Sequence, residues 1–109
     1  MTKFRIATLL GTLLLLACAV TAMAGMQDFT FGNQGGLTIV NLYVSPSSSP
    51  DWGGDVLGSN VLGPGQSTDV WFDGSSDECY WDIMVVLENG VQDYISSVDL
   101  CSVSYVSYP

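Results

Sequence analysis

Residues 25–109 predict an all-β fold, a small antiparallel β-sandwich of about six strands with one disulfide. Apolar and polar residues alternate along most of this segment, which is the two-residue period of strands. Glycine and proline interrupt the pattern at short intervals, as turns require. Two cysteines, Cys79 and Cys101, are expected to pair, and closing the loop between them should contribute roughly 3 kcal/mol to stability.

Residues 1–24 have the layout of a cleaved secretory signal helix. Lys3 and Arg5 precede an apolar run over residues 6–17, and Ala22 and Ala24 offer small side chains before Gly25. Cleavage there leaves residues 25–109, which show no repeat and no linker, as a single domain. The predicted location is therefore the periplasm or the medium, with no membrane span.

Cys18 leaves a second interpretation of the N-terminus open. The sequence Leu15-Leu16-Ala17-Cys18 resembles a lipobox, in which Cys18 would carry lipid and anchor a structural protein to the cell envelope. In the other interpretation Cys18 only fills an apolar region, because a thiol behaves as a small hydrophobe.

Six strands are expected, over residues 28–33, 37–44, 67–73, 79–88, 91–97 and 98–106. The second has apolar residues on both faces, which predicts a central strand. In the third, either Val70 and Phe72 or Trp71 face inward, depending on register. The turn Asn89-Gly90 favours a type I′ hairpin. Trp81 is expected in the core, beside a disulfide that crosses the core.

The charge of the predicted domain is strongly negative. Both basic residues precede residue 25 and all eleven acidic residues follow it, so the side-chain charge of residues 25–109 is −11. This field excludes nucleic acid and attracts cations or basic partners.

The residue types also argue against an enzyme. Residues 25–109 contain no His, Lys or Arg, so the usual general bases and oxyanion-stabilising cations are missing. A carboxylate-dependent hydrolase is the one alternative, with Asp82 and Asp99, or Asp55 and Asp69, as acid pairs. Asp55, Asp82 and Asp99 are instead expected to accept hydrogen bonds that fasten a long loop to the sheet.

Two loops are candidate sites. Asp73, Asp77 and Glu78 could supply oxygen ligands to Ca²⁺; the alternative is that they are solvated turn residues that cap backbone donors. In the long loop over residues 45–58, Asp51, Trp52 and Asp55 are candidate binding residues. Exposed aromatic side chains there and elsewhere would suit a glycan: Trp52, Trp71, Tyr94, Tyr105 and Tyr108. Alternatively, most of these aromatics fill the core.

Several short motifs, in this order, resemble a group of small exported bacterial domains of unknown function: Ser45-Pro46, Trp52-Gly53-Gly54-Asp55-Val56-Leu57-Gly58, Pro64-Gly65-Gln66-Ser67, Cys79-Tyr80-Trp81-Asp82, Asn89-Gly90 and Val98-Asp99-Leu100-Cys101. The resemblance implies a compact β domain with one disulfide and transfers no activity. The resulting prediction is an exported, non-enzymatic binding module for a protein or glycan partner.

Overall fold

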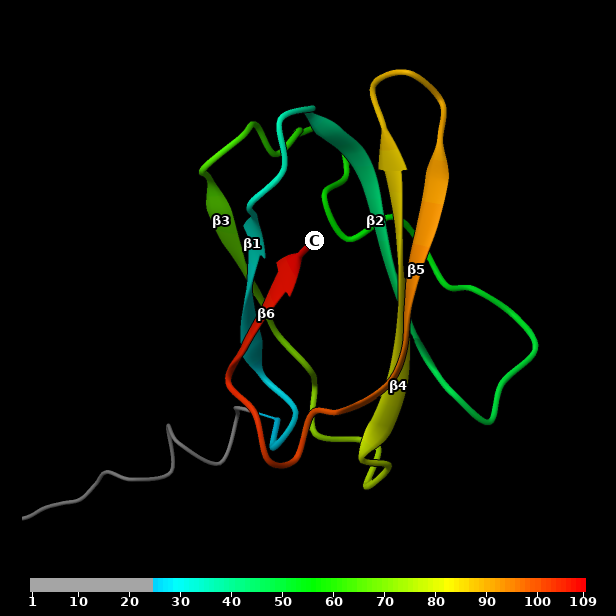
Figure 1. The fold of residues 1–109 in the computed structure, drawn as a ribbon. Helices are drawn as coiled ribbons and strands as arrows, with labels where there is room; N and C mark the ends of the chain where they lie inside the picture. The colour runs from blue at the N-terminus through cyan, green and yellow to red at the C-terminus, as the bar shows by residue number, and fades with distance from the viewer. Residues whose placement is uncertain (1–24) are drawn as a thin grey trace, which may run out of the picture.

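A computed structural model describes residues 25–109, which form six strands (Figure 1). The predicted signal peptide and Cys18 lie outside the described residues. The strands are β1 (Phe29–Asn33), β2 (Ile39–Pro46), β3 (Ser67–Val70), β4 (Tyr80–Leu87), β5 (Gln92–Asp99) and β6 (Tyr105–Tyr108). Among the described residues, none belongs to a helix that could cross a membrane.

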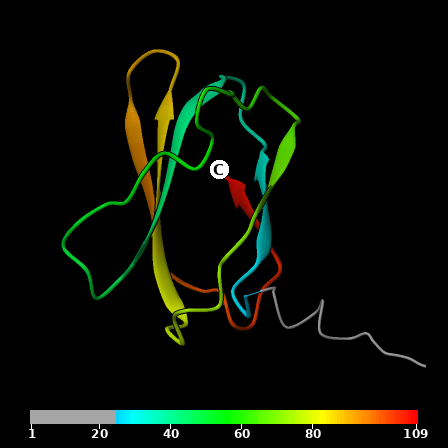
Figure 2. The ribbon, with the colours of Figure 1, turned by 180° about the vertical axis from the view of Figure 1, so that it is seen from behind.

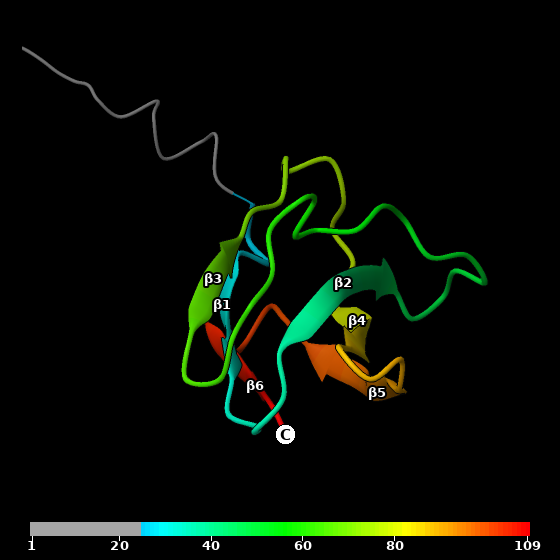
Figure 3. The same ribbon diagram turned by 90° about the horizontal axis from the view of Figure 1, so that it is seen from above.

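The strands form two three-stranded sheets that face each other, which confirms the predicted sandwich (Figure 3). One sheet has the order β2-β4-β5 and is antiparallel throughout. The other has the order β3-β1-β6, and its β1–β6 pair is parallel. The sandwich is therefore mixed at this one pair, because the chain crosses from the end of β5 to the opposite sheet and enters β6 in the direction of β1.

The core lies between the sheets and is built from their inward-facing side chains. Trp81 is 7% exposed, as expected, and its ring packs edge-on against Phe72 with centroids 4.9 Å apart. Val70 and Phe72 face inward, whereas Trp71 is 72% exposed. The register of the third strand is thereby settled. Fully buried side chains come from both sheets and from the turn after β5: Phe31, Ile39, Leu42, Ile83, Val85 and Leu100.

The prediction that the second strand is central was wrong, since β2 is an edge strand of its sheet. Its free edge is nevertheless covered, because the chain returns along it. Val56 N donates to Leu42 O at 2.7 Å, and Ile39 exchanges two backbone hydrogen bonds of 2.9 Å with Leu62. This returning segment places Leu57 and Leu62 in the core.

The predicted last strand was also wrong in its bounds. β5 continues to Asp99, and a turn separates it from β6. The turn forms because Asp99 Oδ1 accepts a hydrogen bond from Cys101 N, while Asp99 O accepts one from Ser102 N. The disulfide consequently joins the adjacent ends of β4 and β5 in one sheet and does not span the core.

Candidate binding surface

The 45–58 loop leaves the end of β2, projects from the body of the sandwich and returns to the edge of β2 (Figure 2). Asp55 fixes its return. Its Oδ1 accepts hydrogen bonds from Leu42 N at 2.9 Å and Leu57 N at 3.0 Å, and its Oδ2 accepts one from Asn41 Nδ2 at 2.8 Å. The carboxylate thus occupies the place on the β2 edge where a neighbouring strand would otherwise supply acceptors.

These contacts control the charge of Asp55. Partial burial raises the pKa of its carboxyl group, but the hydrogen bonds from Leu42, Asn41 and Leu57 lower it by more. The pKa of Asp55 therefore lies below the ordinary value, because all three donors favour the ionised form. Of the three roles expected for Asp55, the structure shows the structural acceptor, and both of its carboxylate oxygens already accept hydrogen bonds.

The outgoing half of the loop is held by hydroxyl groups. Ser45 Oγ donates to Asp51 O at 2.6 Å, and Ser47 Oγ donates to Asp82 Oδ1 at 2.7 Å. The same oxygen of Asp82 accepts a hydrogen bond from Ser97 N at 2.9 Å, where β5 bulges and Ser97 has a φ of 56°. Asp82 therefore fastens both the loop and the bulge to β4.

Trp52 lies in this loop beside Tyr94 of β5. The two ring centroids are 6.3 Å apart with the planes at 33°, and the side chains are 36% and 53% exposed. Tyr94 pairs across the strands with Met84, which is 8% exposed although it lies outside the core cluster. Trp52 and Tyr94 form the aromatic surface of the outer face of this sheet. Asp51 is exposed next to it.

The other expected aromatic residues do not join this surface. Trp71 is exposed on the sheet that contains β3, Tyr105 accepts a hydrogen bond from Gln34, and Tyr108 donates one to Asp93 Oδ2 at 2.7 Å. The last bond links the two sheets, lowering the pKa of Asp93 and raising that of Tyr108. Of the five candidates, Trp52 and Tyr94 are the two whose rings form an aromatic pair in the described structure.

The 73–78 loop does not gather its carboxylates. Asp73 Oδ1 accepts a hydrogen bond from Ser75 N, and contacts with the Ser75 hydroxyl and amide lower the pKa of Asp73. Glu78 Oε1 accepts one from Ser48 Oγ at 2.8 Å. Within residues 25–109, the set of three candidate metal ligands with atoms within 4.8 Å of one another is a different one: Cys79, Asp99 and Cys101.

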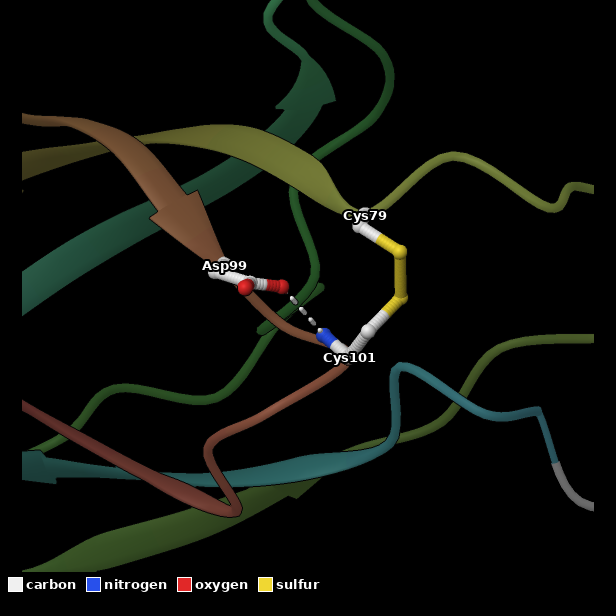
Figure 4. Close-up of side chains that lie close together, drawn as sticks. All are labelled: Cys79, Asp99 and Cys101. Carbon is white, nitrogen blue, oxygen red and sulfur yellow. Dashed lines mark hydrogen bonds between the residues drawn. A yellow bond between two sulfur atoms is a disulfide. The ribbon is translucent and has the colours of Figure 1, made fainter.

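That set is the disulfide and its neighbour (Figure 4). Cys79 and Cys101 are bonded to each other, with Cα atoms 5.1 Å apart, which confirms the predicted pairing. Bonded sulfurs are not thiolates, so they do not offer the ligands that zinc prefers. Asp99 points its carboxylate at Cys101 N, as the dashed line in Figure 4 marks, and so caps the turn that carries the second cysteine.

Two buried polar residues organise the loops and carry no signal that sequence reasoning used. Gln27 is 0% exposed, and its Nε2 donates to Ser76 O at 2.9 Å and Glu78 O at 2.8 Å. Asn33 is 1% exposed, and its Nδ2 donates to Leu37 O and Leu62 O. Gly35 and Gly36 are among the glycines whose interruption of the alternating pattern indicates a turn, and Asn33 Oδ1 accepts the Gly35 N–H within that turn.

Comparisons with known proteins found no similar sequence or fold. No family model matches the chain, and no curated protein or solved structure gives a significant match.

Proposed function

We propose that this protein is an exported, non-enzymatic binding module that contacts its partner through Trp52 and Tyr94. The observation that carries the proposal is the fixed position of the 45–58 loop, in which Asp55 makes three hydrogen bonds while Trp52 stays partly exposed. A loop already held in one conformation loses little conformational entropy on binding, and aromatic side chains provide large contact areas.

The engagement of the carboxylates supports a binding role over a hydrolytic one. Asp55, Asp82 and Asp99 accept hydrogen bonds from backbone or hydroxyl donors, and Asp69 Oδ1 accepts one from Thr30 Oγ1 at 2.8 Å. A glycosidase instead needs one of its two carboxyl groups to hold a proton that it can deliver. No feature of the described residues favours that second function.

Export rests on the sequence of residues 1–24 and agrees with the disulfide, because disulfides persist in oxidising compartments. The mass of the mature protein separates the two forms of export. Cleavage before Gly25 predicts an unmodified chain over residues 25–109, whereas lipid attachment predicts a chain that begins at a modified Cys18.

Affinity capture tests the proposal. Biotin-tagged protein, secreted from the full chain, is incubated with envelope and medium fractions of the encoding cells. The variants are Trp52→Ala and, as a control at a more exposed aromatic at the start of β4, Tyr80→Ala, whose side chain is 57% exposed against 36% for Trp52. The wild type and Tyr80→Ala are expected to retain the same component, and Trp52→Ala should retain less than about a tenth of it.

The nature of the partner follows from treating the fractions first with protease or with periodate. Loss of capture after protease identifies a protein, and loss after periodate identifies a glycan. Equal capture by Trp52→Ala and wild type, or no specific capture by the wild type, would overturn the proposal.

A further inference from the structure

The free edge of β3 offers unpaired backbone groups on the sheet opposite the one that carries Tyr94. Asn33 N donates to Gln66 O at 2.9 Å, so alternate residues from Gln66 onward face β1. The intervening residues, Ser67, Asp69 and Trp71, therefore face away from β1. Their backbone N–H and C=O groups make no hydrogen bond within the described part of the chain. An unpaired strand edge is the structural requirement for binding an added strand.

The inner side of this edge is of mixed character, with exposed valines between polar side chains. Two open pockets, of about 400 and 350 Å³, lie along it and share Val56 as a lining residue. The first is the more polar, with Val61 beside Asn60, Gln66 and Thr68, and the second is lined by Val70 and Trp71 among others. Val56 and Val61 are 41% and 55% exposed. An apolar side chain of an added strand would cover these valines.

The outer side of the same edge is acidic and aromatic. A smaller pocket, of about 180 Å³, is lined by Asp28, Thr30, Asp69 and Trp71 among others. Trp71 is 72% exposed, the largest exposure among the bulky apolar side chains of the described residues. Asp28 Oδ1 accepts a hydrogen bond from Phe72 N, and its Oδ2 is buried without a donor in the described structure, so Asp69 is the exposed carboxylate of this side. A cation between an indole and a carboxylate gains from both.

Charge complementarity identifies the occupant. Residues 25–109 carry eleven carboxylates and no basic side chain, so the domain offers its partner no cation. Successive side chains of a strand point to opposite faces, so a segment paired with β3 would present one residue to Asp69 and Trp71 on the outer side and its two neighbours to Val56 and Val61 on the inner side.

We propose that the free edge of β3 binds an extended cationic segment of a partner protein as an added strand. A Lys or Arg of that segment lies over Asp69 and Trp71, and the apolar residues on either side of it lie against Val56 and Val61. This proposal rests on the binding role proposed above but uses a second surface, so an experiment can exclude one surface as a binding site without excluding the other.

Titration with a fluorescent peptide tests it, using the purified protein at low salt. The probe is Ser-Thr-Val-Lys-Val-Thr-Ser, and its anisotropy should saturate with a half-point below about 1 mM. Replacing its Lys by Glu, or methylating the backbone nitrogens that would pair with β3, should weaken binding at least about tenfold, because these changes remove the cation and the strand pairing respectively.

The protein variants separate specific docking from general attraction to an acidic surface. Trp71→Ala and Asp69→Asn, at exposed positions, should each weaken binding about tenfold. Trp52→Ala and Asp51→Asn are the matched controls and should leave it within about twofold, which also keeps this test independent of the Trp52 surface. Three results would overturn the proposal: absence of saturation, binding by Trp71→Ala and Asp69→Asn as strong as by the wild type, or binding of the N-methylated peptide as strong as of the unmodified one.

Discussion

The 45–58 and 73–78 loops are both rich in Asp, Ser and Gly, yet the protein holds them by opposite means. The 45–58 loop is held by its own carboxylate and hydroxyl groups, chiefly Asp55 on the edge of β2. The 73–78 loop is held through its backbone carbonyls, which accept hydrogen bonds from the neutral donors Gln27 and Trp81, and through the disulfide at Cys79.

This difference shows that composition does not determine what an acidic loop does. A carboxylate becomes structural when it meets unpaired backbone N–H groups, as Asp55 does at Leu42 and Leu57. Asp73 meets only the donors of its own turn and stays exposed. The first loop should therefore respond to pH and the second to reduction.

Removal of the disulfide should have the largest effect and should act on the second loop. The double variant Cys79→Ser/Cys101→Ser is expected to lose roughly 3 kcal/mol of unfolding free energy, because the bridge closes a loop of about 23 residues in the unfolded chain. Urea unfolding measures the loss. Limited proteolysis should show new cleavage within residues 73–78 before any within residues 45–58, and the reverse order would contradict this division of roles.

Asp55→Ala should come next and should act on the first loop. Two backbone N–H groups and the Asn41 amide lose their acceptor, at an expected cost of about 2 kcal/mol once solvent screening of this half-buried group is allowed for. Asp51→Ala is the control, since the Asp51 side chain makes no hydrogen bond among the described residues, and it should change stability by less than about 0.5 kcal/mol. Equal urea midpoints for the two variants would refute the role of Asp55.

The pH dependence of Asp55 sharpens the contrast. Its pKa is lower in the folded than in the unfolded state, so its stabilising contribution is present above about pH 4 and is lost as pH falls through the folded pKa. The difference in unfolding free energy between wild type and Asp55→Asn should be largest at pH 7 and shrink toward pH 2. An unchanged difference across this range would show that ionisation of Asp55 does not hold the loop.

Calcium should have the smallest effect. Asp73, Asp77 and Glu78 are not gathered as ligands in the described structure, and Asp73 and Glu78 already accept hydrogen bonds from Ser75 and Ser48. Millimolar Ca²⁺ is therefore expected to raise the melting temperature no more than Mg²⁺ at equal ionic strength. A larger rise that Asp77→Asn abolishes would establish a calcium site in the 73–78 loop.

The sequence predicted those features that depend on residues close together in the chain. The alternation around Trp81 gave β4 and its buried face, and the position of Asp55 after Gly53-Gly54 suggested a loop acceptor. Gln27 could not be found in this way, because its partners Ser76 and Glu78 are 49 and 51 residues away in the chain. The wrong prediction that β2 is a central strand has the same cause. Its apolar residues are typical of a central strand, but its second edge is covered by a returning loop, which the local pattern of β2 does not reveal.

Amide hydrogen exchange tests most directly whether the 45–58 loop is held in place to present Trp52. At pH 7 the amides of Leu42 and Leu57, which donate to Asp55, should exchange far more slowly than that of Ser75, which donates within an exposed turn. In Asp55→Asn the Leu57 amide should lose most of this protection while core amides of β4 keep theirs. If Leu57 in the wild type exchanges as fast as Ser75, the loop is not fixed and the basis of the proposed binding surface is removed.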